Sequence, residues 1–119
     1  MKSLAFVVLA LAAVSCDDLG IVCTTEARAG LEVRVTNAQT GEGVCDAVVT
    51  ATDGAYAETL IAVGCRYYGA YERPGIYTVR AERSGFDTGT VPGVQVVLNS
   101  GPCRHVETAQ LEIRLNKAQ

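Results

Sequence analysis

Apolar and polar residues alternate with a period of two along most of the chain after residue 30, and this pattern constrains the fold more than any other feature. Successive side chains of a β-strand point to opposite faces, so such alternation indicates strands with one buried face. Residues 109–115, which read Ala-Gln-Leu-Glu-Ile-Arg-Leu, are the clearest case. Turn residues separate seven such stretches, at 31–36, 45–51, 56–63, 65–71, 77–82, 91–98 and 108–115. The sequence therefore predicts an all-β fold, a seven-stranded antiparallel β-sandwich.

The first 15 residues have the pattern of an export signal. Lys2 precedes an apolar run that extends to Val14. This run is too short to cross a hydrocarbon core of about 30 Å as a helix, but it has the length of a signal-peptide core. It ends in Ala13-Val14-Ser15-Cys16, which resembles the lipobox of bacterial lipoproteins. In that family the peptidase cuts before the cysteine, and the cysteine carries lipid.

The lipobox departs from the usual pattern at Ala13, where leucine is favoured. The same segment also suits the ordinary signal peptidase, so two processing routes stay open. The cysteine count favours lipidation, because an exported chain in an oxidising compartment seldom keeps an odd thiol. The chain has five cysteines. If Cys16 carries lipid, four remain to form two disulfides, namely Cys23, Cys45, Cys65 and Cys103.

This processing divides the chain into three parts. We predict a lipoprotein signal peptide at 1–15, a lipid-anchored leash at 16–30 and a folded domain at 31–119. The charge balance limits the partners of that domain. Ten Lys and Arg residues against 13 Asp and Glu residues give a net charge of −3, whereas nucleic-acid-binding domains and polybasic membrane patches need clustered positive charge. We therefore expect no nucleic-acid partner, and membrane attachment only through Cys16.

The order of turn and core residues resembles the carboxypeptidase regulatory-like domain, which is a prealbumin-like, Ig-like sandwich. The resemblance covers about residues 31–115 and rests on the Thr40-Gly41-Glu42 turn, on residues 47–51 and 73–79, and on Ser84-Gly85-Phe86. Cys45-Asp46 stands where a Pro-Gly pair is common. The resemblance implies an accessory module that does no chemistry itself. We therefore expect a non-catalytic, lipid-anchored module of the bacterial cell envelope, facing outside the cytoplasm, that binds or scaffolds another envelope protein.

The inventory of reactive residues agrees with a module that is not an enzyme. His105 is the only histidine, and a zinc site needs several ligands. Cys103-Arg104-His105 is better explained as a disulfide cysteine followed by a histidine at a strand edge than as a nucleophile pair. The serines after the signal, Ser84 and Ser100, lie in turns and outside any G-x-S-x-G motif.

Paired carboxylates occur at Asp17-Asp18, at Asp46 with Asp53, and at Glu58 with Glu72. Clustered loop oxygens can bind calcium, but turn capping and solubility explain these residues more simply. We therefore expect no cofactor and no metal site.

A tyrosine cluster gives the alternative function. Tyr67, Tyr68 and Tyr71 lie within five residues, between Arg66 and Arg73. An apolar ring with a hydrated hydroxyl suits stacking on sugars or contact with a protein. Strand alternation places Tyr67 and Tyr68 on opposite faces, so at least one of them fills the core. The alternative to a protein-binding module is therefore a carbohydrate-binding module that uses residues 67–71.

The topology of an Ig-like sandwich predicts one of the three possible cysteine pairings. In such a sandwich the second strand begins at the end of the domain where the third strand finishes, which brings Cys45 close to Cys65. If the last strand runs parallel to the first, Cys103 lies near the start of the first strand, which Cys23 precedes. We therefore predict Cys45–Cys65 and Cys23–Cys103. Residues 17–22 then form a tether of about 20 Å at full extension, which holds the domain close to the bilayer.

Overall fold

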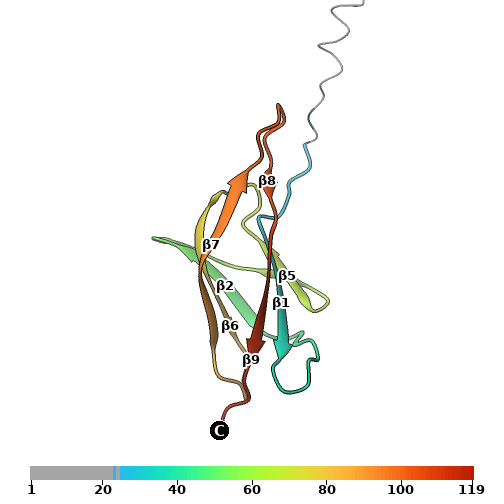
Figure 1. The fold of residues 1–119 in the computed structure, drawn as a ribbon, viewed down its shortest axis with the longest axis vertical. Coiled ribbons are helices and arrows are strands. Elements are labelled where there is room, and N and C mark those ends of the chain that lie inside the picture. The colour runs from blue at the N-terminus through green and yellow to red at the C-terminus, as the bar shows by residue number, and fades with distance from the viewer. Residues whose placement is uncertain (1–22, 24) are drawn as a thin grey trace, which may run out of the picture. The chain divides into compact units, whose positions relative to one another are not determined.

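The computed structural model describes residue 23 and residues 25–119, in which the regular elements are all strands. The predicted signal peptide at 1–15, Cys16 and the tether at 17–22 lie outside the described residues. The chain divides into two compact units. The described part of the first comprises Cys23, residues 25–26 and residues 100–103, and the second comprises residues 27–99 and 104–119. All nine described strands belong to the second unit (Figure 1).

Four strands form one sheet, here called sheet A, in the order β4-β5-β1-β9. They are β1 (Leu31–Asn37), β4 (Ile61–Val63), β5 (Arg66–Gly69) and β9 (Ala109–Leu115). β1 is antiparallel to β5 and parallel to β9, along its whole length in the second case. This parallel pairing is the exception to the predicted antiparallel order. The first and last long strands of the domain, β1 and β9, are neighbours in sheet A and run in the same direction.

Five strands form the other sheet, here called sheet B, in the order β3-β2-β6-β7-β8, with all pairs antiparallel. They are β2 (Val48–Asp53), β3 (Tyr56–Thr59), β6 (Gly75–Glu82), β7 (Gly89–Leu98) and β8 (Val106–Glu107). The register between β6 and β7 shifts beside Pro92-Gly93, where Gly93 has a φ of 70°. Proline cannot donate to a sheet ladder, so a bulge is a position where it fits.

The structure has nine described strands instead of the predicted seven. One predicted stretch divides between the two sheets, and a further short strand, β8, lies outside every predicted stretch. Residues 56–63 divide into β3 and β4 at Leu60, which is buried and donates its N–H to the carbonyl oxygen of Val49 at 2.8 Å. The other additional strand, β8, precedes the predicted stretch 108–115; it pairs with β7, whereas β9 pairs with β1. Alternation reports which face is buried and does not report which sheet a strand joins.

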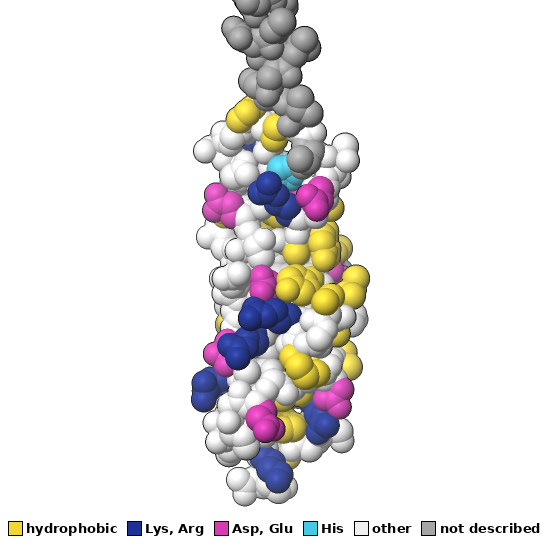
Figure 2. All heavy atoms as spheres, turned by 90° about the vertical axis from the view of Figure 1, so that its right-hand side faces the viewer, with side chains coloured by type: hydrophobic (Ala, Val, Ile, Leu, Met, Phe, Trp, Pro, Cys, Tyr) yellow, Lys and Arg dark blue, Asp and Glu magenta, His cyan; other side chains and the backbone are white. Residues whose placement is uncertain are grey.

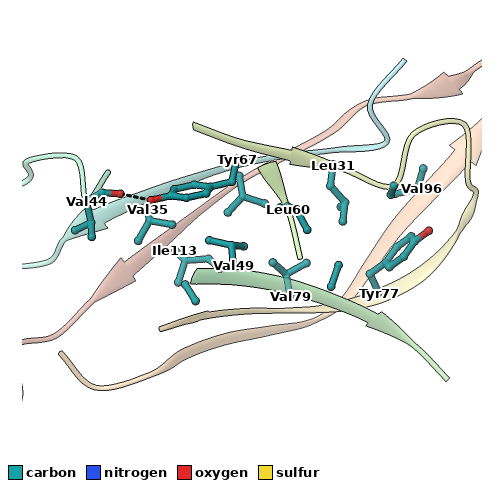
Figure 3. Packing of buried hydrophobic residues seen from close by; sticks show 14 of the residues in the cluster. Leu31, Val35, Val44, Val49, Leu60, Tyr67, Tyr77, Val79, Val96 and Ile113 are labelled. Atoms are coloured by element: carbon teal, nitrogen blue, oxygen red, sulfur yellow. Dashed lines mark hydrogen bonds between the residues drawn. The ribbon is translucent and has the colours of Figure 1, made fainter. Parts of the chain in front are cut away.

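The inner faces of the two sheets enclose a hydrophobic core (Figure 3). Leu31, Val33 and Val35 of β1 are fully buried, as the alternation predicts. Tyr67 and Tyr77 are the largest buried side chains, one from each sheet. The fold is thus confirmed as all-β with two packed sheets in the described residues.

Candidate functional site

Both predicted disulfides are present. Cys65 lies in the two-residue turn between β4 and β5, and it bonds to Cys45, which precedes β2, with a Cα–Cα distance of 4.1 Å. Gly64, the first residue of that turn, has a φ of 65°, which glycine adopts without strain. In the first unit Cys23 bonds to Cys103, with a Cα–Cα distance of 5.2 Å. The four described cysteines therefore pair as the topology predicts.

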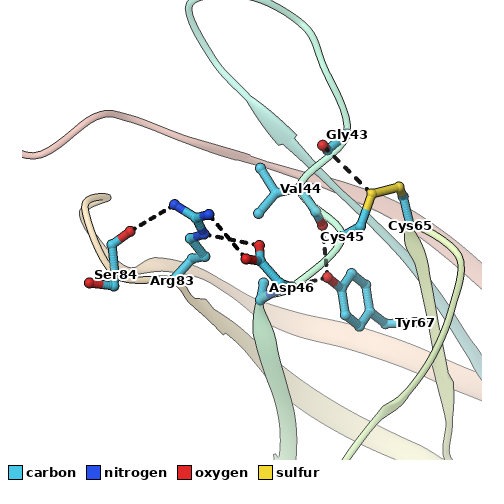
Figure 4. A network of polar contacts seen from close by, with 9 residues as sticks. Gly43, Val44, Cys45, Asp46, Cys65, Tyr67, Arg83 and Ser84 are labelled. Carbon is cyan, nitrogen blue, oxygen red and sulfur yellow. Dashed lines mark hydrogen bonds and ion pairs between the residues drawn. A yellow bond between two sulfur atoms is a disulfide. The ribbon is translucent and has the colours of Figure 1, made fainter.

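The Tyr67 hydroxyl joins the same two segments as the Cys45–Cys65 disulfide (Figure 4). It donates to the carbonyl oxygen of Val44 at 2.7 Å and accepts the N–H of Ala47 at 3.0 Å. The side chain is only 1% exposed. Tyr67 therefore belongs to the core, and the prediction that it forms part of a ligand surface is wrong. Its buried ring packs between the sheets while its hydroxyl satisfies two backbone groups of the loop.

A small cavity of about 170 Å³ lies next to this loop, between the Cys45-Asp46 segment, Arg83 and Phe86. The Arg83 guanidinium donates to both carboxylate oxygens of Asp46, at 2.9 and 3.0 Å, and lies 5.6 Å from the Phe86 ring centroid. The hydrogen bond from Arg83 lowers the pKa of Asp46. Small-molecule sites usually measure about 300–1,000 Å³, so this cavity is too small for a substrate of ordinary size.

A second polar cluster is centred on Glu72, in the loop between β5 and β6. Its carboxylate contacts His105 Nδ1 at 2.6 Å and accepts the backbone N–H groups of Arg28 and Val106 at 2.9 and 3.1 Å. The interaction with His105, followed by the bond from Arg28, lowers the pKa of Glu72. Glu72 also has a φ of 50°, a conformation that costs a non-glycine residue energy. These bonds hold the loop against the segments before β1 and at β8.

The contact between His105 and Glu72 distinguishes between the two interpretations of the Cys103-Arg104-His105 segment. Cys103 is disulfide-bonded, and His105 is 9% exposed with its Nδ1 directed at a carboxylate. The two residues therefore serve separate structural contacts, as the simpler interpretation of the sequence expects. Sequence reasoning missed Glu72 as the partner of His105, because 33 residues separate them and no local spacing relates them.

The remaining predicted carboxylates contact protein donors. Asp53 pairs with Arg73 at 3.1 Å, and the Arg73 guanidinium stacks 3.6 Å from the centroid of the Tyr56 ring. Glu58 accepts hydrogen bonds from the Tyr56 hydroxyl and from the N–H of Ala70, and the first of these raises the pKa of Tyr56. Within residue 23 and residues 25–119, no group of three or more Asp, Glu, His or Cys residues could hold a metal ion. Asp17-Asp18 lies outside the described residues.

The other two residues of the predicted ligand surface lie at the surface. Tyr68 lies on the outer face of sheet A, in a row that runs from Ile61 through Tyr68 and Glu32 to Gln110. Glu32 accepts bonds from Arg66 at 2.7 Å and from Gln110 at 3.1 Å. Figure 2 views the side on which β1 and β5 lie in Figure 1, where hydrophobic side chains gather beside charged ones.

Tyr71 belongs to the loop after β5 and is 46% exposed. Its neighbours Ala70 and Glu72 both have positive φ, at 53° and 50°. This backbone conformation directs the tyrosine away from the strand pattern that sequence reasoning assumed. Of the three predicted tyrosines, Tyr68 and Tyr71 therefore remain candidate contact residues.

The chain matches no family model, and no curated protein matches it. In the described residues no helix is long and apolar enough to cross a membrane.

We predict that Tyr67→Phe destabilises the domain by about 1–3 kcal/mol. The change removes one hydroxyl and leaves the Val44 carbonyl and the Ala47 N–H without their partner. Urea unfolding monitored by circular dichroism measures the loss. Tyr68→Phe is the matched control, because it removes a hydroxyl from the adjacent, outward-facing residue. Equal stability of the two variants would contradict the assigned role of Tyr67.

We also predict that the contribution of Glu72 to stability depends on pH. Because the folded state lowers the pKa of Glu72 below its ordinary value of 4.5, the contribution is fully present above pH 4.5 and is lost as the pH falls through the lower, folded value. The unfolding free energies of the native chain and of Glu72→Gln should therefore converge in acid. Glu107→Gln, which removes an exposed carboxylate of β8, controls for net charge. A difference that stays constant down to pH 2 would refute the assignment.

Proposed function

We propose that the chain is a non-catalytic, lipid-anchored module of a bacterial cell envelope, which faces outside the cytoplasm and binds or scaffolds another envelope protein. One observation carries the anchoring part of this proposal. Cys23 bonds to Cys103 and Cys45 bonds to Cys65, so the odd cysteine of the five is Cys16, which is separated from the N-terminal apolar run only by Ser15. Two disulfides also suit an oxidising compartment outside the cytoplasm.

The two-sheet, all-β architecture supports assignment of the domain to the carboxypeptidase regulatory-like type, with its prealbumin-like sandwich. The accessory role of that type agrees with the way the charged residues are used. The contacts of Asp46, Asp53, Glu58, Glu72 and His105 all join loops or strands of the domain to one another. The features that can meet a partner are instead apolar or aromatic side chains at the surface, and recognition through a surface patch is the function that suits them.

The outer face of sheet A is the proposed contact surface. It places Ile61 and Tyr68 in one row with Glu32 and Gln110. Partly exposed aromatic side chains next to polar groups are common in protein interfaces. The same combination also suits sugars, because a tyrosine ring stacks on the C–H face of a sugar while amide and carboxylate groups bind its hydroxyls. The exposure of Tyr71 favours a carbohydrate-binding module as the second candidate.

Replacement of Cys16 tests the anchor. In cells that export the chain, palmitate labelling should be lost in Cys16→Ser, and the protein should move from the membrane fraction to the soluble exported fraction. Cys23→Ser is the matched control, because it removes a neighbouring cysteine that belongs to a disulfide and should leave the label in place. Label that persists in Cys16→Ser would overturn the proposal.

Photocrosslinking in the native envelope tests the contact surface and separates the two candidates. A photoreactive residue at position 68, on the outer face of sheet A, should link the chain to an envelope protein. The same residue at position 78, on the outer face of sheet B, should link it much less. Retention on a glycan column that is lost in Tyr68→Ala and Tyr71→Ala, without a protein crosslink, would replace the first candidate with the second.

A further inference from the structure

Strand β4 is an unusually unprotected edge. It lies at one end of sheet A, and all three of its residues are exposed, with Ile61 at 63% and Val63 at 62%. Each of the other edge strands in the described residues contains charge, as Glu58 in β3, Glu107 in β8, and Glu112 with Arg114 in β9. Charged residues and proline on an edge strand prevent it from pairing with another chain. β4, with the sequence Ile-Ala-Val, contains neither.

The hairpin geometry leaves one residue of β4 available for pairing. Val63 and Arg66 flank a two-residue turn, and such a flanking pair exchanges backbone hydrogen bonds. Bonded and non-bonded pairs alternate along an antiparallel ladder, so Ile61 also directs its backbone groups toward β5. Ala62 therefore directs its N–H and C=O away from the sheet. The ladder does not extend further back, because the N–H of Leu60 is donated to sheet B.

We propose that β4 pairs with β4 of a second copy of this chain, antiparallel and with two-fold symmetry about Ala62. In this register the N–H of each Ala62 donates to the carbonyl of the other, which makes two hydrogen bonds. Ile61 of each copy then lies opposite Val63 of the other copy on the outer face of sheet A. The two most exposed large aliphatic side chains of the described residues thus cover each other, and two copies of sheet A form one continuous sheet.

Charge and ladder length favour a second copy over another occupant. In this register a charge at position 62 would lie directly opposite its own duplicate, and a charge at position 61 or 63 would lie diagonally across from its duplicate, where like charges repel. An uncharged strand avoids this repulsion, and β4 is uncharged. A longer peptide strand would gain nothing from its extra length, since β4 offers one outward-facing residue.

The size of the contact sets its strength. A pairing limited to three-residue strands and their side chains buries less than the roughly 1,000 Å² that stable interfaces need. The dimer is therefore weak and forms at high concentration of the chain. This inference is independent of the proposed function, because it requires neither a lipid anchor nor an envelope partner.

Sedimentation velocity of the full chain over a concentration series tests the proposal. The native chain should show a reversible monomer–dimer equilibrium. Ile61→Lys should weaken the dimer by about 10-fold or more, because it removes both Ile61–Val63 contacts and places the two lysine side chains diagonally across the paired edge. Ile76→Lys is the matched control, because Ile76 is 59% exposed on a strand in the interior of sheet B, and it should leave the equilibrium unchanged. A native chain that stays monomeric up to millimolar concentration, or equal effects of the two variants, would overturn the proposal.

A cysteine at the symmetry axis gives a second test that does not depend on how Ile61→Lys folds. In the proposed register the two Ala62 Cα atoms lie about 5.5 Å apart, a spacing that a disulfide spans. Mild oxidation of Ala62→Cys should yield a dimer in which peptide mapping finds the two introduced cysteines bonded to each other and the two native disulfides intact. Ala57→Cys, an exposed position on edge strand β3, is the control. Dimers linked as readily through position 57, or through Cys16 alone, would refute the two-fold pairing.

Discussion

The attachment of loops to a thin two-sheet core is the physical constraint on which the rest of this structure depends. The core consists mainly of valine, leucine and alanine from short strands, and a small domain buries a smaller share of its surface on folding than a large one does, so contacts outside the core contribute more. Three kinds of contact attach the loops. The Cys45–Cys65 disulfide and the Tyr67 hydroxyl fix the segment before β2 to the β4–β5 hairpin. The Glu72 carboxylate fixes the next loop to the segments around Arg28 and Val106.

This use of polar groups bears directly on function. A catalytic or metal site needs charged groups that converge on a space where a ligand can sit. Here Asp46, Asp53 and Glu72 each face a cation or backbone donors of the domain itself, and the cavity beside Arg83 is small. The charged groups named above thus bond within the domain, whereas apolar side chains such as Ile61 and Val63 are exposed. The proposed binding role and the proposed pairing of β4 both rest on this contrast.

The sequence predicts the local features of the fold and misses the ones that depend on the path of the chain. Alternation identifies the buried residues of β1, and topology identifies both disulfides. The division at Leu60 is missed, because a stretch that changes sheets keeps its apolar pattern. Strand β8 is missed because its two residues are too short a run to show alternation. Tyr67 and Tyr68 are correctly placed on opposite faces, but the spacing does not reveal which of them is buried. The Glu72–His105 contact is beyond sequence reasoning, since it joins residues that only the folded loop brings together.

Intact mass spectrometry of the native protein, isolated from the cells that make it, tests the central claim most directly. The proposal is that the chain is held at a membrane by Cys16 and presents a disulfide-bonded binding domain. It predicts a mature chain that begins at Cys16, carries the mass of a diacylglycerol group and an acyl chain, and contains two disulfides with no free thiol. A chain that begins at Cys16 without lipid, or that retains residues 1–15, would contradict it.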